Sequence, residues 1–310
     1  MTSAENFKVY TTGKLPFTIN DLKRREEPLQ VLMCSPEYFD IIDVKNVHME
    51  GMAQQLNKEL ALKQWSDLKF VYAQLLDQGL IEGLKIILGV KGCEDMVFCA
   101  NQTFPWMGPN QKREVWMSRM RHPSRQREVP FFENYFLEMG YQPRHFAKTP
   151  LFEGMGDTIP HPGKLLLYGG YGHRSNKTAY EELSEQLSVP VIALELINEN
   201  FYHLDTCFVP LSETQVMLCK EAFTEEGLAL IHQCFEEVLE IPMEEAIATF
   251  CLNAHVVNNQ KTNKKAAILQ LGSVAAKAAL NKCGYTIFEV ETSEYMKSGG
   301  SVFCMKMMFF

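Results

Sequence analysis

Short runs of consecutive apolar residues alternate along the chain with longer segments in which apolar residues recur every three or four positions. Runs of the first kind predict buried strands, and segments of the second kind predict amphipathic helices. We therefore expect strands at residues 29–34, 84–89, 95–101, 164–170, 189–196, 266–272 and 285–291. We expect helices at residues 52–79, 178–187, 224–240 and 273–284. This alternation predicts an α/β fold.

Three of the helical segments end on a glycine that leads into a strand-like run. They are "LLDQGL" at Gly79, "FLEMGY" at Gly140 and "LNKCGY" at Gly284. A glycine just past a helix end adopts the left-handed cap conformation. The recurrence suggests a repeated helix–glycine–strand unit, although an ordinary doubly wound sheet would also produce it.

The chain has no Pro- or Ser-rich stretch that would separate two domains. Its 310 residues, 46% of them hydrophobic, are enough for a sizeable core. We expect one domain over residues 29–310, with residues 1–28 as an N-terminal extension packed on it.

The composition argues against several classes of partner. The net charge is −8, and an acidic chain is a poor candidate for binding nucleic acid or an anionic membrane. The densest basic stretch, residues 112–127, is either a solvated face or a local anion site. No segment approaches the roughly 20 apolar residues that cross a bilayer, and the first residues lack the apolar region of a signal peptide.

The cysteines indicate a reducing compartment. Nine of them are scattered without CxxC pairs, a pattern that favours free thiols and a cytoplasmic location. We find no paired close ligands for a zinc site. The composition leaves a homo-oligomer open.

The segment "EYMKSGGSVFCMKMMFF" places Cys304 shortly after Gly299 and Gly300. This cysteine is either one more buried sulfur or a nucleophile, and a nucleophilic cysteine needs a histidine and a carboxylate near it. The best candidates are His203 and Asp205 in "YHLDTCF", which would face the same side of a strand. The alternative is a solvent-facing pair at a strand end.

Further polar residues gather in short glycine- or proline-flanked segments. "FEGMGDTI" holds Glu153 and Asp157, which would attract a cation or form an ordinary turn. Asp95 and Asn101 lie in "CEDMVFCAN", where turn chemistry at a strand end is the alternative. Arginine binds carboxylates with two hydrogen bonds, and two loop arginines that could do so, or could simply be surface residues, are Arg125 and Arg174.

Taken together, six of these motifs resemble the guanidine-modifying superfamily. They occur in the order "CEDMVFCAN", "HPSRQ", "EGMGD", "GGYGHRSN", "YHLDTC" and "KSGGSVFC", and they extend from about Val31 to Cys304. The superfamily includes arginine deiminase, dimethylarginine dimethylaminohydrolase, arginine dihydrolase and the amidinotransferases. The resemblance implies the pentein fold, a five-bladed α/β propeller of pseudo-fivefold ββαβ repeats around a central active-site channel.

The resemblance also implies a role for each residue that matches a family motif. Cys304 matches the nucleophile and His203 the general acid/base. Asp205 resembles the carboxylate that orients His203 and touches the guanidine. Glu153 matches the principal guanidinium-binding carboxylate, and Asp157 is its partner in the loop.

The remaining matches concern substrate binding. Arg125 and Arg174 resemble the arginines that grip the substrate α-carboxylate, and we group Asp95 with the substrate-binding residues. Asn101 stands where arginine deiminases carry an aspartate, which puts simple deimination in doubt. The dihydrolase branch, with "FTAN"-like motifs, resembles this sequence at that position.

The function implied by the resemblance is therefore that of a cysteine-dependent hydrolase of a guanidino compound, foremost an arginine dihydrolase. It would act through a covalent S-alkylthiouronium on Cys304 and would require no metal or organic cofactor. Arginine deiminase or dimethylarginine dimethylaminohydrolase activity is the alternative. An amidinotransferase and a catalytically silent pentein that binds a partner are further alternatives, and the fold alone does not choose among them.

Overall fold

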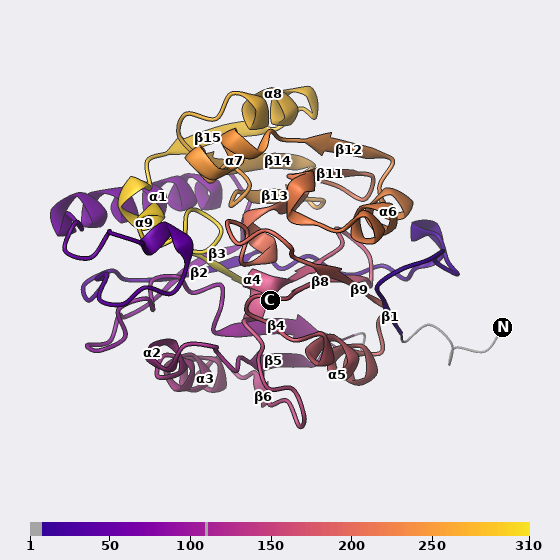
Figure 1. Ribbon diagram of the computed structural model, residues 1–310, viewed down its shortest axis with the longest axis horizontal. Coiled ribbons are helices and arrows are strands. Elements are labelled where there is room, and N and C mark those ends of the chain that lie inside the picture. The colour runs from indigo at the N-terminus through magenta and orange to yellow at the C-terminus, as the bar shows by residue number, and fades with distance from the viewer. Residues whose placement is uncertain (1–7, 109–110) are drawn as a thin grey trace.

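The computed structural model describes residues 8–108 and 111–310, and the described residues form five small sheets arranged in a ring (Figure 1). Each sheet has a middle strand that pairs antiparallel with one neighbour and parallel with the other. A helix connects the two parallel strands on the outer rim of the ring. This is the ββαβ unit, repeated five times.

The five sheets, which we call blades, follow one another around the ring. Their strands are, in order within each sheet, β16 (Met307–Phe309), β2 (Gln30–Cys34) and β3 (Gly83–Ile87); β4 (Thr103–Met107), β5 (Arg113–Met117) and β6 (Gln142–Arg144); β7 (Thr158–Pro160), β8 (Leu167–Tyr171) and β9 (Val191–Glu195); β10 (Phe208–Pro210), β11 (Gln215–Leu218) and β12 (Glu237–Glu240); β13 (His255–Asn259), β14 (Lys264–Gln270) and β15 (Thr286–Val290). The connecting helices are α1 (Lys58–Asp77), α3 (Val129–Glu138), α5 (Lys177–Leu187), α6 (Glu225–Cys234) and α8 (Ala275–Lys282).

Shorter helices lie between these strands and helices, either between successive blades, within a blade or ahead of the first blade. They are α2 (Pro123–Gln126), α4 (Gly154–Asp157), α7 (Met243–Thr249), α9 (Ser293–Met296) and the 3₁₀ turns η1 (Ile19–Asp21), η2 (Val47–Met49), η3 (Leu204–Thr206) and η4 (Lys220–Ala222). Within the described ranges, none of the helices is both long and apolar enough to span a bilayer.

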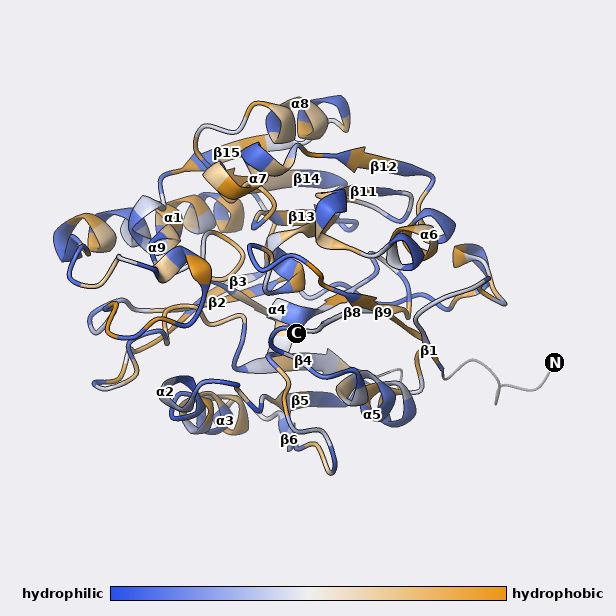
Figure 2. Ribbon diagram, viewed as in Figure 1, coloured by the Kyte–Doolittle hydropathy of each residue, from blue (hydrophilic) through white to orange (hydrophobic). Residues whose placement is uncertain are grey.

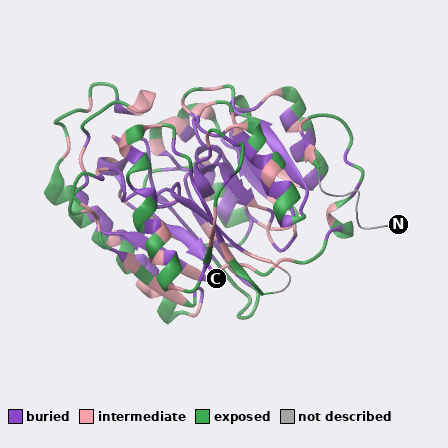
Figure 3. Ribbon diagram, turned by 90° about the horizontal axis from the view of Figure 1, so that it is seen from below, coloured by how far each residue is buried: buried purple, intermediate pink, exposed green. Residues whose placement is uncertain are grey.

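The blade helices are amphipathic, and their apolar faces cover the sheets (Figure 2). In α1 the buried face includes Leu68, Tyr72 and Leu75, whereas Leu60 and Leu76 are exposed. Burial of large side chains is the main source of stability in such a ring, and Figure 3 shows the strands buried inside an exposed periphery.

The predicted glycine caps are confirmed. Gly79, Gly140 and Gly284 have φ angles of +71°, +81° and +74° and follow α1, α3 and α8. Each turns the chain from the rim helix back towards the third strand of its blade. The recurrence in the sequence therefore marks three of the five repeats.

Two predicted elements are wrong. Residues 95–101 form buried turns, with hydrogen bonds such as Phe98 N to Asp95 O, and the strand β4 begins only at Thr103. The predicted helix 224–240 ends at Cys234, and its last residues instead form β12 against β11. In both segments the apolar run is compatible with more than one secondary structure, and its contacts with the rest of the fold determine which one forms.

The first blade is built from both ends of the chain. β16 pairs antiparallel with β2, Met308 lying opposite Val31, and this pairing closes the ring. Near the N-terminus, β1 (Val9–Tyr10) adds a parallel strand to β9. The division into residues 1–28 and 29–310 stays a prediction, and residues 1–7 of that extension lie outside the described residues.

Candidate active site

The predicted site residues come from one recurring position in the fold. In each blade, the segment that immediately precedes the first strand carries a buried polar or thiol side chain towards the ring axis. These residues are Asn101 before β4, Glu153 before β7, His203 and Asp205 before β10, Asn253 before β13 and Cys304 before β16. The pseudo-fivefold repeat thus gathers residues from all five blades at one place.

Cys304 is the centre of this group. Its side chain is buried, and its Sγ lies 3.4 Å from Asp205 Oδ2 and 3.2 Å from Asn253 Nδ2. Burial, followed by the negative charge of Asp205, raises the pKa of the thiol well above its usual value, and the Asn253 hydrogen bond opposes this. The thiol is therefore neutral in this arrangement.

Asn253 holds the loop that carries Cys304. Its Oδ1 accepts hydrogen bonds from the backbone N–H groups of Ser301 (3.0 Å) and Cys304 (3.1 Å), and its Nδ2 also donates to the backbone oxygen of Asp205 (3.0 Å). One buried amide thus ties the segments before β10, β13 and β16 together. We did not single out Asn253 from the sequence, because "CLNAHVV" contains no recognisable motif.

Glu153 is the hub of the charged groups. Its Oε2 accepts from His203 Nε2 (2.7 Å) and Arg174 Nη1 (3.0 Å), and its Oε1 accepts from the backbone N–H of Arg121 (2.9 Å). Burial alone would raise the pKa of Glu153, but Arg174 and His203 outweigh it, and the pKa lies below its usual value. Glu153 is therefore ionised.

His203 is paired with Glu153, where the sequence predicted Asp205. The expected strand is absent from this described segment, because His203 caps the 3₁₀ turn η3 and Asp205 lies inside it, so the two side chains do not share a face. Burial lowers the pKa of His203 to about 4, and Glu153 only partly opposes this. The neutral imidazole donates from Nε2 to the ionised Glu153, which leaves Nδ1 as a proton acceptor.

Asp205 instead faces the sulfur. Burial raises its pKa to about 7, against the opposing effects of the Cys304 thiol and of Lys306. Within the described part of the chain, three buried polar atoms here lack a hydrogen-bond partner: Asp205 Oδ1, His203 Nδ1 and Asn101 Nδ2. Buried polar groups are normally hydrogen-bonded, so these three atoms mark where a polar ligand would bind.

Asp157 supports this arrangement from behind. Its Oδ2 accepts from Ser175 Oγ (2.6 Å) and its Oδ1 from the backbone N–H of Leu204 (3.1 Å), next to His203. Burial raises its pKa well above the usual value. Both oxygens are used by the protein, so Asp157 positions the His203 turn, and a direct contact with substrate stays a prediction.

The two glycines of "EGMGD" allow α4 to lie against Asn101. A Cβ on Gly156 would lie 2.2 Å from Asn101 Nδ2 and 3.5 Å from the His203 ring. A Cβ on Gly154, whose φ is +54°, would lie 2.6 Å from the backbone oxygen of Asn101. Only glycine permits this close approach of the Glu153 segment to its neighbours.

Arg125 fixes the orientation of Asn101. Its Nη1 donates to Asn101 Oδ1 (3.0 Å), its Nη2 donates to the backbone oxygen of Phe98 (3.0 Å), and it forms a buried ion pair with Glu128 (3.2 Å). These contacts turn the amide so that Asn101 Nδ2 is the atom left for a ligand. The predicted contact of Arg125 with a substrate carboxylate stays a prediction, since its fork is occupied by the protein.

Arg174 and Asp95 lie at a small cavity beside Cys304. Arg174 donates to Glu153 and to the backbone oxygen of Lys45 (2.8 Å), and its guanidinium lies 4.7 Å from the ring centre of Tyr202. Asp95 pairs with Lys45 Nζ (2.9 Å). The sequence analysis missed Lys45 and Tyr202, which lie outside the motifs and become recognisable only through these contacts.

All nine cysteines lie in the described ranges, are buried and are free. Among the residues that the structure describes, no group of three or more His, Cys, Asp or Glu side chains is arranged to hold a metal ion. The site as described consists of one thiol, one imidazole, carboxylates, amides and arginines.

Comparison with known proteins agrees with this constellation. Two curated cyanobacterial relatives, the bifunctional arginine dihydrolase/ornithine cyclodeaminases AgrE of Nostoc sp. and ArgZ of Synechocystis sp., are 31% and 32% identical over 277 and 280 residues. These matches cover 89% and 90% of this chain but only 37% of each relative. An N(G),N(G)-dimethylarginine dimethylaminohydrolase of Mycobacterium tuberculosis is 27% identical over 91% of this chain and 86% of its own length.

Solved structures confirm the pentein fold. The N-terminal domain of ArgZ bound to its product superposes with a TM-score of 0.82 at 30% identity, covering 91% of this chain and 97% of that domain. The dimethylarginine dimethylaminohydrolase of Pseudomonas aeruginosa shares the fold, with a TM-score of 0.72 at 19% identity.

A family model covers most of the chain. The model described as N,N dimethylarginine dimethylhydrolase, eukaryotic, matches residues 35–310, a range that includes every site residue discussed above. The chain belongs to the N,N dimethylarginine dimethylhydrolase family.

Proposed function

We propose that this chain is a cysteine-dependent hydrolase of free guanidino compounds and that its substrate is arginine, which it converts to ornithine, carbon dioxide and two molecules of ammonia. The observation that carries the proposal is the amide of Asn101, whose Oδ1 is held by Arg125 and whose Nδ2 is left for a ligand. The similarity to the N-terminal domain of ArgZ, described as an arginine dihydrolase, supports the same choice.

A guanidinium fits the charges of the site. It is a planar cation with several N–H donors. Asp205 Oδ1 is an acceptor without a partner, and the ionised Glu153 adds negative charge on a second converging segment. A bound cation next to Cys304 favours the thiolate, because opposite charge lowers a thiol pKa. The substrate would thus activate the nucleophile that attacks it.

The reaction uses the contacts around Cys304 in sequence. The Cys304 thiol gives its proton to His203 Nδ1 as the sulfur bonds to the guanidinium carbon. His203 then passes this proton to one nitrogen, and that C–N bond breaks to release ammonia. Water, losing a proton to His203 Nδ1, attacks the S-alkylthiouronium and the C–S bond breaks, which yields citrulline. Holding the reactants in one orientation accounts for much of the rate of such a step.

Asn101 allows a second round. The ureido group of citrulline is neutral and carries a carbonyl oxygen, which needs a donor. Asn101 Nδ2 can donate, whereas an ionised aspartate cannot. A second addition of Cys304 and a second water release the other ammonia, and the remaining carbamate of ornithine loses carbon dioxide. Two waters are consumed for one arginine.

Hydrolysis of methylated arginine to citrulline and a methylamine is the second candidate. The description of the family model and the relative from M. tuberculosis favour it. The same thiol, imidazole and carboxylates would perform it, and it would end after one round.

Product analysis separates these possibilities. The enzyme is incubated with arginine, dimethylarginine, agmatine and citrulline, and the products are identified by mass. We expect ornithine from arginine with little free citrulline, and a shift towards citrulline in Asn101→Asp. Cys304→Ser should fold and bind arginine but turn nothing over. Stoichiometric citrulline from wild-type enzyme would refute dihydrolysis, and turnover by Cys304→Ser would refute the nucleophile.

A further inference from the structure

A second chamber lies on the far side of the site residues. Its volume is about 360 Å³, within the range of about 300–1,000 Å³ typical of small-molecule sites. Several residues of its walls follow the site residues closely along the chain. His255 and Val257 come after Asn253, Phe208 comes after Asp205, and Lys306 comes after Cys304. Of the described residues, none lines both this chamber and the small cavity beside Cys304.

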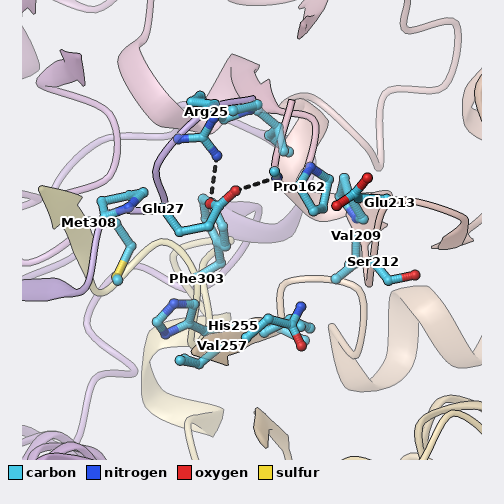
Figure 4. Close-up of a pocket in the computed structure, with 18 of the residues that line it drawn as sticks. Arg25, Glu27, Pro162, Val209, Ser212, Glu213, His255, Val257, Phe303 and Met308 are labelled. Atoms are coloured by element: carbon cyan, nitrogen blue, oxygen red, sulfur yellow. Dashed lines mark hydrogen bonds and ion pairs between the residues drawn. The ribbon is translucent and has the colours of Figure 1, made fainter. Parts of the chain in front are cut away.

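The walls of the chamber are largely apolar. Figure 4 shows Arg25 and Glu27 on one side of the space and His255 and Val257 on the other. The apolar lining includes Leu29, Met155, Phe208, Val257, Phe303 and Met308. Such a surface favours a hydrocarbon body in the ligand.

Most charges at the chamber are already paired. Arg25 Nη2 lies 2.6 Å from Glu27 Oε2, and Glu27 Oε1 accepts from the backbone N–H of Gly163 (2.6 Å). Glu213 pairs with Arg24 and, at 3.8 Å, with Lys164. Glu27 therefore faces one cation and Glu213 two, so neither carboxylate lacks a cation.

Lys306 is different. Its side chain is fully buried, and in the part of the chain that the structure describes its Nζ has no hydrogen-bond partner. The Phe303 ring lies close to it, 3.1 Å from Nζ to the ring centre. Leaving a buried amine without a partner is unfavourable, and a negatively charged ligand atom would supply the missing contact.

We propose that this chamber binds a small monocarboxylate with an apolar body and that the carboxylate pairs with Lys306. One unpaired amine matches one negative charge, and a dianion such as phosphate would meet Glu27 and Glu213 at the walls. The proposal does not depend on the proposed function, because the chamber and the Cys304 cavity share no lining residue.

Proton uptake should accompany binding. Burial lowers the pKa of Lys306 to about 7, against the opposing effects of Asp205, Cys99 and Cys304, which face it. His255 also faces it and stays neutral, because burial and then Lys306 lower its pKa well below the usual value. Above pH 7 the amine is largely neutral, so a carboxylate that requires the ammonium form must bind together with a proton.

The test uses octanoate as the probe in isothermal titration calorimetry with the full chain at pH 8.0. Titrations in two buffers of different ionisation enthalpy report proton uptake, and octanol and inorganic phosphate serve as neutral and dianionic comparisons. Lys306→Met removes the amine and keeps the apolar stem. Lys220→Met is the matched control, because that lysine pairs with Glu240 on the surface and does not line the chamber. Val257→Phe fills the chamber and leaves Lys306 in place.

We expect saturable binding of octanoate with proton uptake, at least a tenfold weaker dissociation constant in Lys306→Met and Val257→Phe, and no change in Lys220→Met. Three results would overturn the proposal: no saturable binding to wild-type protein, equal affinity for octanol or phosphate, or undiminished octanoate affinity in Val257→Phe. If Lys306→Met does not fold, the Val257→Phe result and the proton uptake of wild-type protein still decide the question.

Discussion

Replacing Asn253 with aspartate should make Cys304 less reactive. The change keeps an oxygen that accepts from the backbone N–H groups of Ser301 and Cys304. It removes the Nδ2 donor, which lies 3.2 Å from Cys304 Sγ and 3.0 Å from the backbone oxygen of Asp205. A hydrogen bond to a charged group contributes about 1.5–3 kcal/mol. Since 1.4 kcal/mol is a factor of ten, the thiolate fraction should fall about 10- to 150-fold.

The measurement is the rate at which iodoacetamide alkylates Cys304, followed by mass analysis of the peptide that contains it. Asn259→Asp is the matched control. Asn259 is also buried, its Oδ1 accepts from the backbone N–H groups of Lys261 and Thr262, and its Nδ2 donates to two backbone oxygens at Gly79 and Leu80. Both variants should lose about 1–3 kcal/mol of unfolding free energy from two hydrogen bonds, but only Asn253→Asp should slow alkylation. Equal alkylation rates in the two variants would refute the reasoning.

Three further predictions follow from the site and its surroundings. Gly156→Ala should lower kcat at least tenfold, because its Cβ would lie 2.2 Å from Asn101 Nδ2; steady-state kinetics with unchanged kcat would contradict this. Arg174→Ala should lower kcat/KM for arginine more than for agmatine, which lacks the α-carboxylate, by a difference of about 2–5 kcal/mol. Equal losses of kcat/KM for the two substrates would show that Arg174 does not bind the carboxylate. Burial lowers the pKa of His161 to about 4, so the unfolded state binds the extra proton as pH falls below about 6.5. In urea titrations the loss of unfolding free energy from pH 6.5 to 5.0 should therefore be smaller in His161→Gln than in wild-type protein by about 2 kcal/mol, and equal losses would contradict this.

Much of the fold could be predicted because its repeats have local signatures. The glycines that cap α1, α3 and α8 are recognisable from their positions after apolar-periodic segments. The resemblance of six ordered motifs then supplied the propeller. The hydrophobic pattern was insufficient to predict the structure of residues 95–101, which form buried turns next to Cys304. A buried apolar run forms a strand only if its backbone pairs with a neighbouring strand.

The site was predictable where a residue belonged to a motif and was not where its role depends on tertiary contacts. The partner of His203 is Glu153, fifty positions earlier in the chain, and only the packing of α4 against η3 brings them together. Asn253 has no motif at all. Its signal is its position: four blades had a predicted polar residue or thiol before the first strand, and the fifth blade, which begins at His255, had none.

The pairing of β16 with β2 links catalysis to the completeness of the ring. Cys304 stands three residues before β16, and the contact of Met308 with Val31 joins parts of the chain that are almost as far apart in sequence as the fold allows. Contacts of such separation are slow to form because a long loop must first be closed. Detachment of β16 would displace Cys304 from the site while leaving the other four blades intact. Turnover therefore reports on whether β16 is paired with β2. When the protein is destabilised, enzymatic activity should be lost before the helical circular-dichroism signal.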